Sequence, residues 1–300
     1  MRLSVGLTNF GNHLEGDQWV PALRRLEDAG MHGVWLTDHV AVPHHIESRY
    51  PFTPDGTFRL READVWYDAL VTLSYVAACT STLELGIGVC VVGLRHPIIL
   101  AKQIATIDRL SGGRVALGIG SGWLREEFQV LDIDPSRPVA RMEGALRLMK
   151  ACWSGAPEPG EYGPYKVDRP FHSLPTPAHE IPVVVGGEGP AALRASVEAA
   201  DGWLGATFDL SQASVAHIAE VAGRVRGLSN PGAVPPRVMT RVPVRRSDLD
   251  GALAHALRTW SEAGVDELVL DVNWANADRS VTVLEQVVRQ GRDLGLVDAA

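Results

Sequence analysis

The stretch LGIGVCVVGLRHPIILAKQIATIDRLSGGRVALGIGSGWLREEF, residues 85–128, carries the pattern that decides the fold. An apolar run over 83–92, rich in valine, leucine and isoleucine, predicts a buried strand. A proline predicts the first turn of a helix over 97–110, which ends at a Gly-Gly pair. Residues 115–119 then predict a second strand. Two strands joined by a crossover helix lie parallel in one sheet, so this stretch indicates an α/β protein.

The same alternation continues on both sides of this stretch. The predicted strands cover 2–8, 34–37, 83–92, 115–119, 182–185, 203–206, 237–244 and 267–272. The predicted helices cover 17–30, 63–80, 97–110, 137–153, 190–200, 212–228, 249–263 and 281–294. This strict order of strand–helix pairs favours a closed (β/α)8 TIM barrel over an open doubly wound sheet, and we expect one domain over residues 1–300.

Two predicted connections are longer than ordinary loops. One follows the second strand over 39–62, and the other precedes the fifth strand over 154–181. Loops of this length inside a compact domain usually serve a site or a lid, and the first lies at the strand ends where barrel enzymes keep their chemistry. The second contains GEYGPYKVD, which predicts a small hairpin packed on the barrel.

Charge and composition narrow the kind of partner. The net charge is −8 and the basic residues form no cluster, which argues against a nucleic-acid partner. No segment approaches the roughly 20 uninterrupted apolar residues that span a bilayer, and the N-terminus lacks the apolar core of a signal peptide. The three scattered cysteines suit a reducing compartment and offer no metal-binding spacing. We therefore expect a cytoplasmic protein that acts on a small molecule.

The stretch VWLTDHV, residues 34–40, places an acid beside an imidazole where a strand ends. In a barrel, Asp38 and His39 would lie on the C-terminal face with other polar strand-end residues, namely Thr8, Asn9, Ser121 and Glu188. The two side chains are either a solvated strand end or a catalytic pair at the mouth of the barrel. Aromatic candidates for the pocket wall are Tyr50, Trp66 and Trp123.

Two glycine-rich segments follow predicted strands. GIGSGW covers 118–123, and VGGEGPAALRA covers 185–195. In the second, Gly186, Gly187 and Gly189 allow a tight turn with outward N–H groups, and a proline then starts a helix whose N-terminus favours an anion. An ordinary tight βα turn would also use glycine, but a second glycine cluster on the same rim favours the phosphate site. The GxGxxG dinucleotide motif is absent after the first strand.

Two other enzyme classes fit the sequence poorly. Metal-dependent hydrolases on this fold generally need a His-x-His pair at the end of the first strand, and here that strand ends Leu-Thr-Asn. His44 and His45 are adjacent in a loop without a convincing third ligand, so we expect no metal. The nucleophile-elbow pattern G-x-S-x-G of serine acyl-transfer enzymes does not occur.

Taken together, these segments resemble the bacterial luciferase-like superfamily, and within it the coenzyme F420-dependent oxidoreductases. The resemblance covers nearly the whole chain and rests on VWLTDHV, on YPFTPDGTF, on the long stretch quoted first and on PVVVGGEGPAALRASVEAADGW. The run of strand, His-Pro, helix, SGGR, strand and GWxxxEF is its most specific part.

The resemblance implies a role for each matching position. His39 matches an imidazole that lies over the cofactor ring, and Asp38 matches an acid beside it, so both are the implied catalytic residues. A bulge with a non-proline cis peptide is expected at Gly88–Val89. The implied cofactor-binding residues are Thr37, Gly88, Val89, Cys90, Ser121, Gly122, Val185, Gly186, Gly187, Glu188 and Gly189. The implied substrate pocket is formed by Asn9, Tyr50, Trp66 and Trp123.

The implied reaction is reversible hydride transfer between coenzyme F420 and a small organic substrate, which is an activated C=C bond, an imine, a ketone or an alcohol. His39 would exchange the proton, and Asp38 would orient His39 or adjust the protonation of the ring. One alternative is an FMN-dependent monooxygenase on the same barrel, although Ser121 and Gly122 lie where flavin-using relatives can carry a phosphate-binding arginine. Another is a barrel that binds flavin or deazaflavin without turnover. The resemblance also allows a homodimer.

Overall fold

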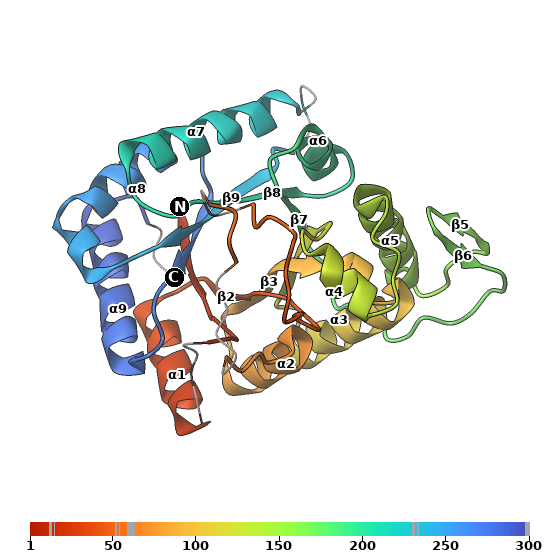
Figure 1. Cartoon of the computed structure of the whole chain (residues 1–300). Coiled ribbons are helices and arrows are strands. Elements are labelled where there is room, and N and C mark those ends of the chain that lie inside the picture. Colours follow the sequence, from red (N-terminus) through yellow and green to blue (C-terminus); the bar gives the residue numbers. More distant parts are fainter. Residues whose placement is uncertain are drawn as a thin grey trace.

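Parallel strands form a closed barrel at the centre of the molecule, with helices around it (Figure 1). The structure is a computed structural model, and it describes residues 1–11, 14, 16–51, 53, 55–58, 64–229, 232 and 234–297. The barrel strands are β1 (Arg2–Gly6), β2 (Gly33–Leu36), β3 (Glu84–Val91), β4 (Val115–Gly120), β7 (Val183–Gly186), β8 (Gly202–Ala206), β9 (Arg237–Pro243) and β10 (Glu267–Asp271). They pair in the order β1-β10-β9-β8-β7-β4-β3-β2, and β2 pairs with β1 to close the ring. The predicted (β/α)8 barrel is confirmed.

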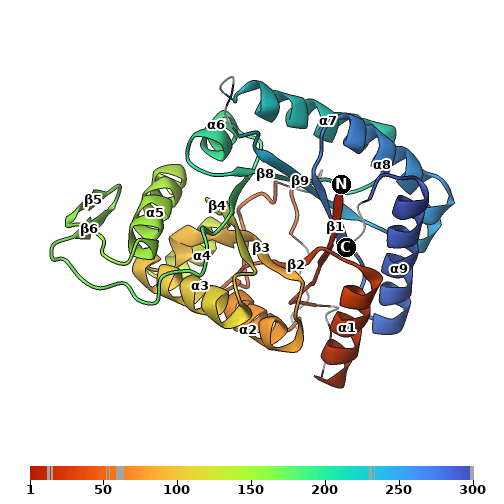
Figure 2. The same cartoon turned by 180° about the vertical axis from the view of Figure 1, so that it is seen from behind.

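Helices form the outer layer of the barrel, and they lie between successive strands in the chain (Figure 2). They are α1 (Trp19–Ala29), α2 (Ala69–Cys79), α3 (Pro97–Ser111), α4 (Arg125–Val130), α5 (Pro138–Trp153), α6 (Pro190–Glu198), α7 (Gln212–Gly227), α8 (Ala252–Glu262) and α9 (Ala277–Asp293). Short 3-10 helices are η1 (Gly16–Gln18), η2 (Val92–Leu94) and η3 (Arg246–Asp250). Within the described residues, none of these helices has the length and apolar character needed to cross a membrane.

Capping residues set where several helices begin and end. The glycine at the end of α3, Gly112, has a φ of 76°, a left-handed conformation that glycine adopts without a steric penalty. Helix α2 begins at Ala69, after Asp68 accepts a hydrogen bond from the N–H of Val71 at 2.9 Å. The predicted start of this helix at residue 63 lies outside the described residues. Asn276 caps α9 in the same way, so that helix begins four residues earlier than predicted.

The predicted hairpin is present between α5 and β7. Strands β5 (Gly160–Tyr162) and β6 (Tyr165–Val167) pair antiparallel and lie beside α5 at the edge of the molecule (Figure 1). Gly144 on α5 allows this contact, because a Cβ at that position would overlap the carbonyl oxygen of Tyr162. The hairpin therefore packs on the helical layer rather than on the barrel wall.

The interior of the barrel is filled with side chains, so the open space lies above them. Buried apolar residues from six of the barrel strands make up this inner cluster, namely Trp35, Ala116, Val184, Leu204, Met239 and Val269. The Trp35 indole has room because β3 carries glycine at 86, where a Cβ would collide with the ring. A packed interior leaves the carboxyl ends of the strands as the place for a site.

Ion pairs close the opposite end of the barrel. Arg237 bridges the carboxylates of Glu84 and Glu267, and Ser4 donates a hydrogen bond to Glu267 at 2.6 Å. Burial alone would raise the pKa of Glu84, but His32 and the charge of Arg237 together hold that pKa at about 2. Glu84 therefore stays ionised beside Arg237.

Candidate active site

A cavity of about 490 Å³ opens at the carboxyl ends of the barrel strands. The predicted site residues that line it are Thr37, Asp38, His39, Tyr50, Trp66, Gly88, Val89, Ser121, Gly122, Trp123, Gly186 and Gly187. Five other predicted residues are not among the described lining residues, namely Asn9, Cys90, Val185, Glu188 and Gly189. The lining also includes residues that the sequence analysis did not single out, among them Phe10, Phe58, Thr207, Phe208, Arg241 and Asp271.

His39 is held at the cavity by the carboxylate of Glu127. The Nδ1 atom of His39 lies 2.6 Å from Oε2 of Glu127, whose side chain is only 2% exposed. The other oxygen of this carboxylate accepts hydrogen bonds from the N–H groups of Val40 and Ala41, at 2.6 and 3.1 Å. With Nδ1 bound in this way, Nε2 is the ring nitrogen that can exchange a proton with a ligand. The sequence signal for Glu127 is the glutamate of the GWxxxEF motif.

Asp38 has a different partner from the one predicted. Its two carboxylate oxygens bind Arg95 at 2.7 Å each, and Oδ2 also accepts from the N–H of Val91 at 3.0 Å. Burial opposes the charge on Arg95, but the hydrogen bonds and charge of Asp38 outweigh it and raise the pKa of the guanidinium. The predicted role of Asp38 in orienting His39 is therefore corrected, because Glu127 orients the ring and Asp38 fixes the end of β3.

Asn9 supports the cavity from below. Its side chain is fully buried, and Oδ1 accepts a hydrogen bond from the Thr37 hydroxyl at 2.7 Å. Its Nδ2 donates to the carbonyl of Tyr67 at 2.7 Å. Asn9 thus joins the ends of β1 and β2 to the segment before α2, which corrects its predicted place in the pocket wall, while Thr37 does line the cavity.

The bulge in β3 forms part of the cavity floor. The Gly88–Val89 peptide bond is cis, as predicted, and the register of β3 against β4 shifts between Ile87 and Cys90. The Val89 side chain fits because its neighbours Gly120 and Gly186 have no side chain. A Cβ at either position would lie only 2.6 or 2.7 Å from a Val89 methyl group. Burial raises the pKa of the Cys90 thiol, so the thiol stays protonated. Cys90 is not among the described residues that line the cavity.

Arg241, on β9, supports this bulge from across the barrel. Its Nη1 donates to the carbonyl of Gly88 at 2.7 Å, and its other nitrogens bind the Asp271 carboxylate at 2.5 and 3.1 Å. Burial opposes the charge of Arg241, but Asp271 outweighs it and raises the pKa of the guanidinium. The sequence signal for this pair is a second charged residue near the carboxyl end of each of two mostly apolar strands, Arg241 on β9 and Asp271 on β10.

The predicted anion turn lies across the cavity from His39's loop, between β7 and α6. Gly187 has a φ of 108°, which side chains rarely adopt, and α6 begins three residues later at Pro190. Gly186 and Gly187 line the cavity, whereas Val185 is fully buried. Glu188 binds Nε2 of His217 on α7 at 2.8 Å.

Five aromatic side chains form what we call the aromatic wall of the cavity, namely Phe10, Tyr50, Phe58, Trp66 and Trp123. The Phe58 ring lies 4.9 Å from Tyr50 and 5.0 Å from Trp123, measured between centroids. Trp66 stacks on Phe10 at 4.1 Å and meets the His39 ring edge-on at 4.8 Å. Phe10 and Phe58 lie in segments without regular periodicity, so no sequence pattern predicted their place in the wall.

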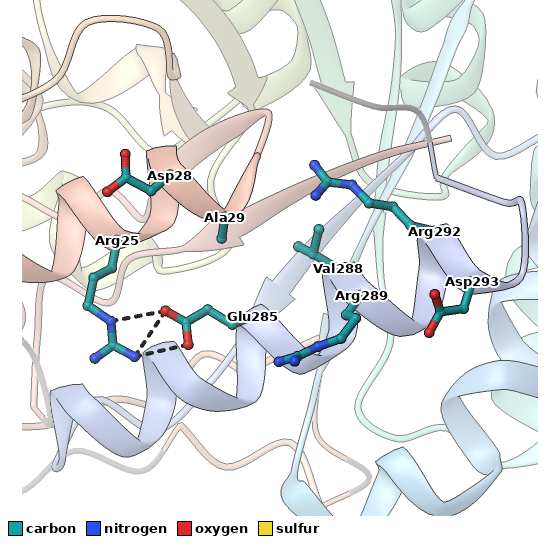
Figure 3. Close-up of a pocket in the computed structure, with 8 residues that line it drawn as sticks. All are labelled: Arg25, Asp28, Ala29, Glu285, Val288, Arg289, Arg292 and Asp293. Carbon is teal, nitrogen blue, oxygen red and sulfur yellow. Dashed lines mark hydrogen bonds and ion pairs between the residues drawn. The ribbon is translucent and has the colours of Figure 1, made fainter.

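A second hollow, of about 530 Å³, lies between α1 and α9 on the outside of the barrel (Figure 3). Its lining mixes both signs of charge, and Arg25 on α1 binds Glu285 on α9 at 3.0 Å. The lining residues belong to the later turns of both helices, which lie toward the end of the barrel opposite the cavity. This hollow is therefore separate from the candidate active site.

The described residues contain one group with metal-ligand geometry, at the closed end of the barrel. It consists of His32, Glu84 and Glu267, whose ligand atoms lie within 4.8 Å of one another. Arg237 already binds both carboxylates, and Arg2 binds Glu267 at 3.3 Å. These guanidinium groups supply the positive charge that a metal ion would bring.

The chain that forms this cavity and bulge matches a known protein family over most of its length. A family model described as luciferase-like monooxygenase matches residues 13–292. The chain belongs to this family. Its membership agrees with the luciferase-like resemblance that the motifs indicated.

Individual relatives of this luciferase-like protein differ in the cofactor that their names give. An F420-dependent glucose-6-phosphate dehydrogenase of Kineococcus radiotolerans is 31% identical over 59% of this chain and 49% of its own length. A monooxygenase structure from Streptomyces bottropensis aligns with a TM-score of 0.70 at 15% identity, covering 97% of this chain and all of that one. The structure of an F420-dependent secondary alcohol dehydrogenase aligns with a TM-score of 0.69 at 16% identity. The alignment covers 96% of this chain and 98% of that one. Both of these structures share the fold of this chain. Two uncharacterized proteins of Mycobacterium tuberculosis are 28% identical over 62% of this chain, and the chain spans 64% of their length.

Proposed function

We propose that this chain is a coenzyme F420-dependent oxidoreductase that acts on a small organic substrate. The observation that carries the proposal is the His39–Glu127 pair, held in a cavity between the β3 bulge and a glycine turn. The names of an F420-dependent relative and of an F420-dependent structural neighbour support the same cofactor.

The described cavity fits a flat ring with an anionic tail. Val89 on the bulge would contact the ring, because glycines at 120 and 186 leave space for its side chain. The N–H groups of the turn at Gly186 and Gly187, with the N-terminus of α6 behind them, would bind a phosphate. A bound deazaflavin supplies or accepts a hydride and reacts poorly with oxygen.

His39 would move the proton that accompanies the hydride. With Nδ1 bound to Glu127, Nε2 can donate a proton to the oxygen or nitrogen of a ketone or imine, or remove one from an alcohol. The Glu127 carboxylate stabilises the positive charge that the ring gains when it accepts a proton. Both directions of the reaction use the same two residues.

Titration with each cofactor tests this proposal. Purified protein is mixed separately with F420 and with FMN, and quenching of the cofactor's fluorescence gives a Kd for each. We expect saturable binding of F420 with a Kd at least ~10-fold lower than that of FMN. A difference of this size corresponds to about 1.4 kcal/mol of binding free energy and separates two cofactors of similar shape. Tighter binding of FMN would instead support an FMN-dependent monooxygenase. Binding of F420 without turnover of any ketone, imine, alcohol or activated alkene would support a barrel that binds the cofactor without catalysis.

A further inference from the structure

The aromatic wall offers apolar contact on the side of the cavity that holds His39. Phe58 is central to it, since its ring lies within 6.2 Å of the Trp66, Trp123 and Tyr50 rings. Rings of this kind bind flat or apolar groups through large contact areas and edge-to-face geometry. The part of a substrate next to His39 would therefore meet apolar surface.

The charged groups that line the cavity are already neutralised by partners in the protein. For the lining residues that the structure describes, the ion pairs are Asp38 with Arg95 and Arg241 with Asp271, while the His39 ring is hydrogen-bonded to Glu127. Burial raises the pKa of the Tyr50 phenol, so its hydroxyl stays neutral. A substrate phosphate or carboxylate would lose its water shell without gaining a described cation, a cost of several kcal/mol.

From the aromatic wall and the neutralised charges we infer that the substrate is an uncharged, largely apolar molecule and not a phosphorylated sugar. Its reacting carbonyl, imine or activated C=C group would lie at His39, and its apolar part would lie against Phe58, Trp66 and Trp123. The inference rests on the proposed function for the reaction, but the preference for an uncharged ligand follows from the cavity itself.

Matched probes test the preference in the wild-type protein. Cyclohexanone and 4-oxocyclohexanecarboxylate differ mainly in charge, and glucose 6-phosphate serves as a phosphorylated probe. Binding is measured by ligand-observed NMR with a saturating amount of the oxidised form of whichever cofactor binds, so that the phosphate turn is occupied, and kcat/KM is measured with the same cofactor. We expect cyclohexanone to bind and react at least ~10-fold better than either anion, because the described lining residues offer no unpaired cation to a carboxylate or phosphate. Equal or better binding of an anionic probe would overturn the inference, as would failure of cyclohexanone to bind at millimolar concentration.

Variants locate the preference on the aromatic wall. Phe58→Ala should raise the Kd for cyclohexanone by ~10-fold, since an aromatic contact in a buried pocket is often worth that much. Trp123→Leu is a second variant in case the first does not fold. Tyr75→Ala is the matched control, because Tyr75 is an exposed aromatic on α2 outside the described lining. Cyclohexanone binding at wild-type strength in both wall variants would contradict the inference.

The two proposals fail in different ways. If FMN binds and F420 does not, the proposed function is wrong, yet the comparison of cyclohexanone with its carboxylate still decides the substrate class. If F420 binds and glucose 6-phosphate is the better substrate, the proposed function holds and the inference about the substrate is wrong.

Discussion

Asp38 and His39 are adjacent in the chain, yet each binds a partner of its own. Asp38 binds Arg95, 57 residues further on, and His39 binds Glu127, 88 residues further on. Successive side chains at a strand end point in different directions, so the two residues reach different partners although both line the cavity. The side chain of Asp38 is fully buried and that of His39 is 10% exposed.

Replacing His39 tests its part in proton transfer. A positioned acid–base group contributes ~10²–10⁴-fold to turnover, so His39→Ala should lower kcat by about this factor while the cofactor still binds. The part of the pH–rate profile that reports the imidazole should disappear. Steady-state kinetics and a cofactor titration measure both effects. Near wild-type turnover with a saturating substrate would mean that the proton comes from elsewhere.

Glu127 acts through His39 as a positioning residue. Glu127→Gln keeps a hydrogen-bonding group but removes the charge, so we expect a loss of ~10-fold or more in kcat, with little change in KM. The pH–rate profile should shift as well, which a purely structural role would not cause. Glu126→Gln is the control, because Glu126 accepts N–H groups of Glu47 and Ser48 from the same loop. Equal kinetic effects in the two variants would contradict the assignment.

The Asp38–Arg95 pair should contribute to stability rather than to proton transfer. Asp38→Asn leaves the guanidinium buried without its charge partner, which typically costs about 3 kcal/mol or more of unfolding free energy. Asp68→Asn is the control, because Asp68 is 43% exposed and lies 3.4 Å from the same arginine. Such an exposed pair is worth about 1 kcal/mol or less. Urea unfolding of both variants checks the difference, and similar losses would argue against a structural role for Asp38.

At the scale of elements, α4 holds both His39 and the long loop that follows β2. Glu126 and Glu127 in its first turn accept backbone N–H groups from residues 40–48, and the N–H of Arg125 donates to the Ser48 hydroxyl at 3.2 Å. The loop that begins at the cavity is therefore fixed by a helix of six residues. Helix α4 was not predicted, because so short a segment shows little periodicity.

The turn between β7 and α6 should determine cofactor affinity. Gly187→Ala places a side chain at a φ of 108°, so the turn must relax and its N–H groups lose their direction. We expect the Kd of the cofactor to rise by ~10-fold or more, since strain of this kind costs of order 1–3 kcal/mol. Gly189→Ala is the control, because its φ is −64° and its Cβ would meet open space. Unchanged affinity in folded Gly187→Ala protein would remove the turn from the site.

At the scale of the whole molecule, chemistry and stability lie at opposite ends of the barrel. The cavity lies at the carboxyl ends of the strands, and the ion pairs of Arg237 with Glu84 and Glu267 lie at the amino ends. The packed cluster around Trp35 separates them. Variants at the closed end should therefore change stability and leave cofactor binding intact.

Glu84 should give the protein an acid-dependent term in its stability. Its pKa is about 2 in the folded chain against an ordinary value of 4.5, so its contribution is fully present above pH 4.5 and is lost as the pH falls toward 2. The difference corresponds to roughly 3 kcal/mol. The gap in unfolding free energy between wild type and Glu84→Gln should shrink over this window. A gap that is constant from pH 6 to pH 3 would contradict the low pKa.

Several features of the fold follow from residues close together in the chain. Apolar runs and helical periodicity predicted the barrel, since they depend only on which side chains recur at a strand or helix spacing. Pro97 and Gly112 predicted the two ends of α3, because the φ angles that proline and glycine favour do not depend on distant residues. The hairpin at 160–167 and the turn at Gly187 were predictable for the same reason.

The sequence by itself thus determined the (β/α)8 barrel, the strand ends that surround the cavity and the glycine turns. Only the tertiary structure decided which charges pair, because an ion pair depends on two side chains that closure of the barrel brings together. Adjacency suggested that Asp38 serves His39, but Glu127 and Arg95 lie nearer to the atoms concerned. Asn9, expected at the pocket, is buried because its amide satisfies backbone and hydroxyl groups of other segments. Burial and partner choice depend on distant residues, and no local pattern records them.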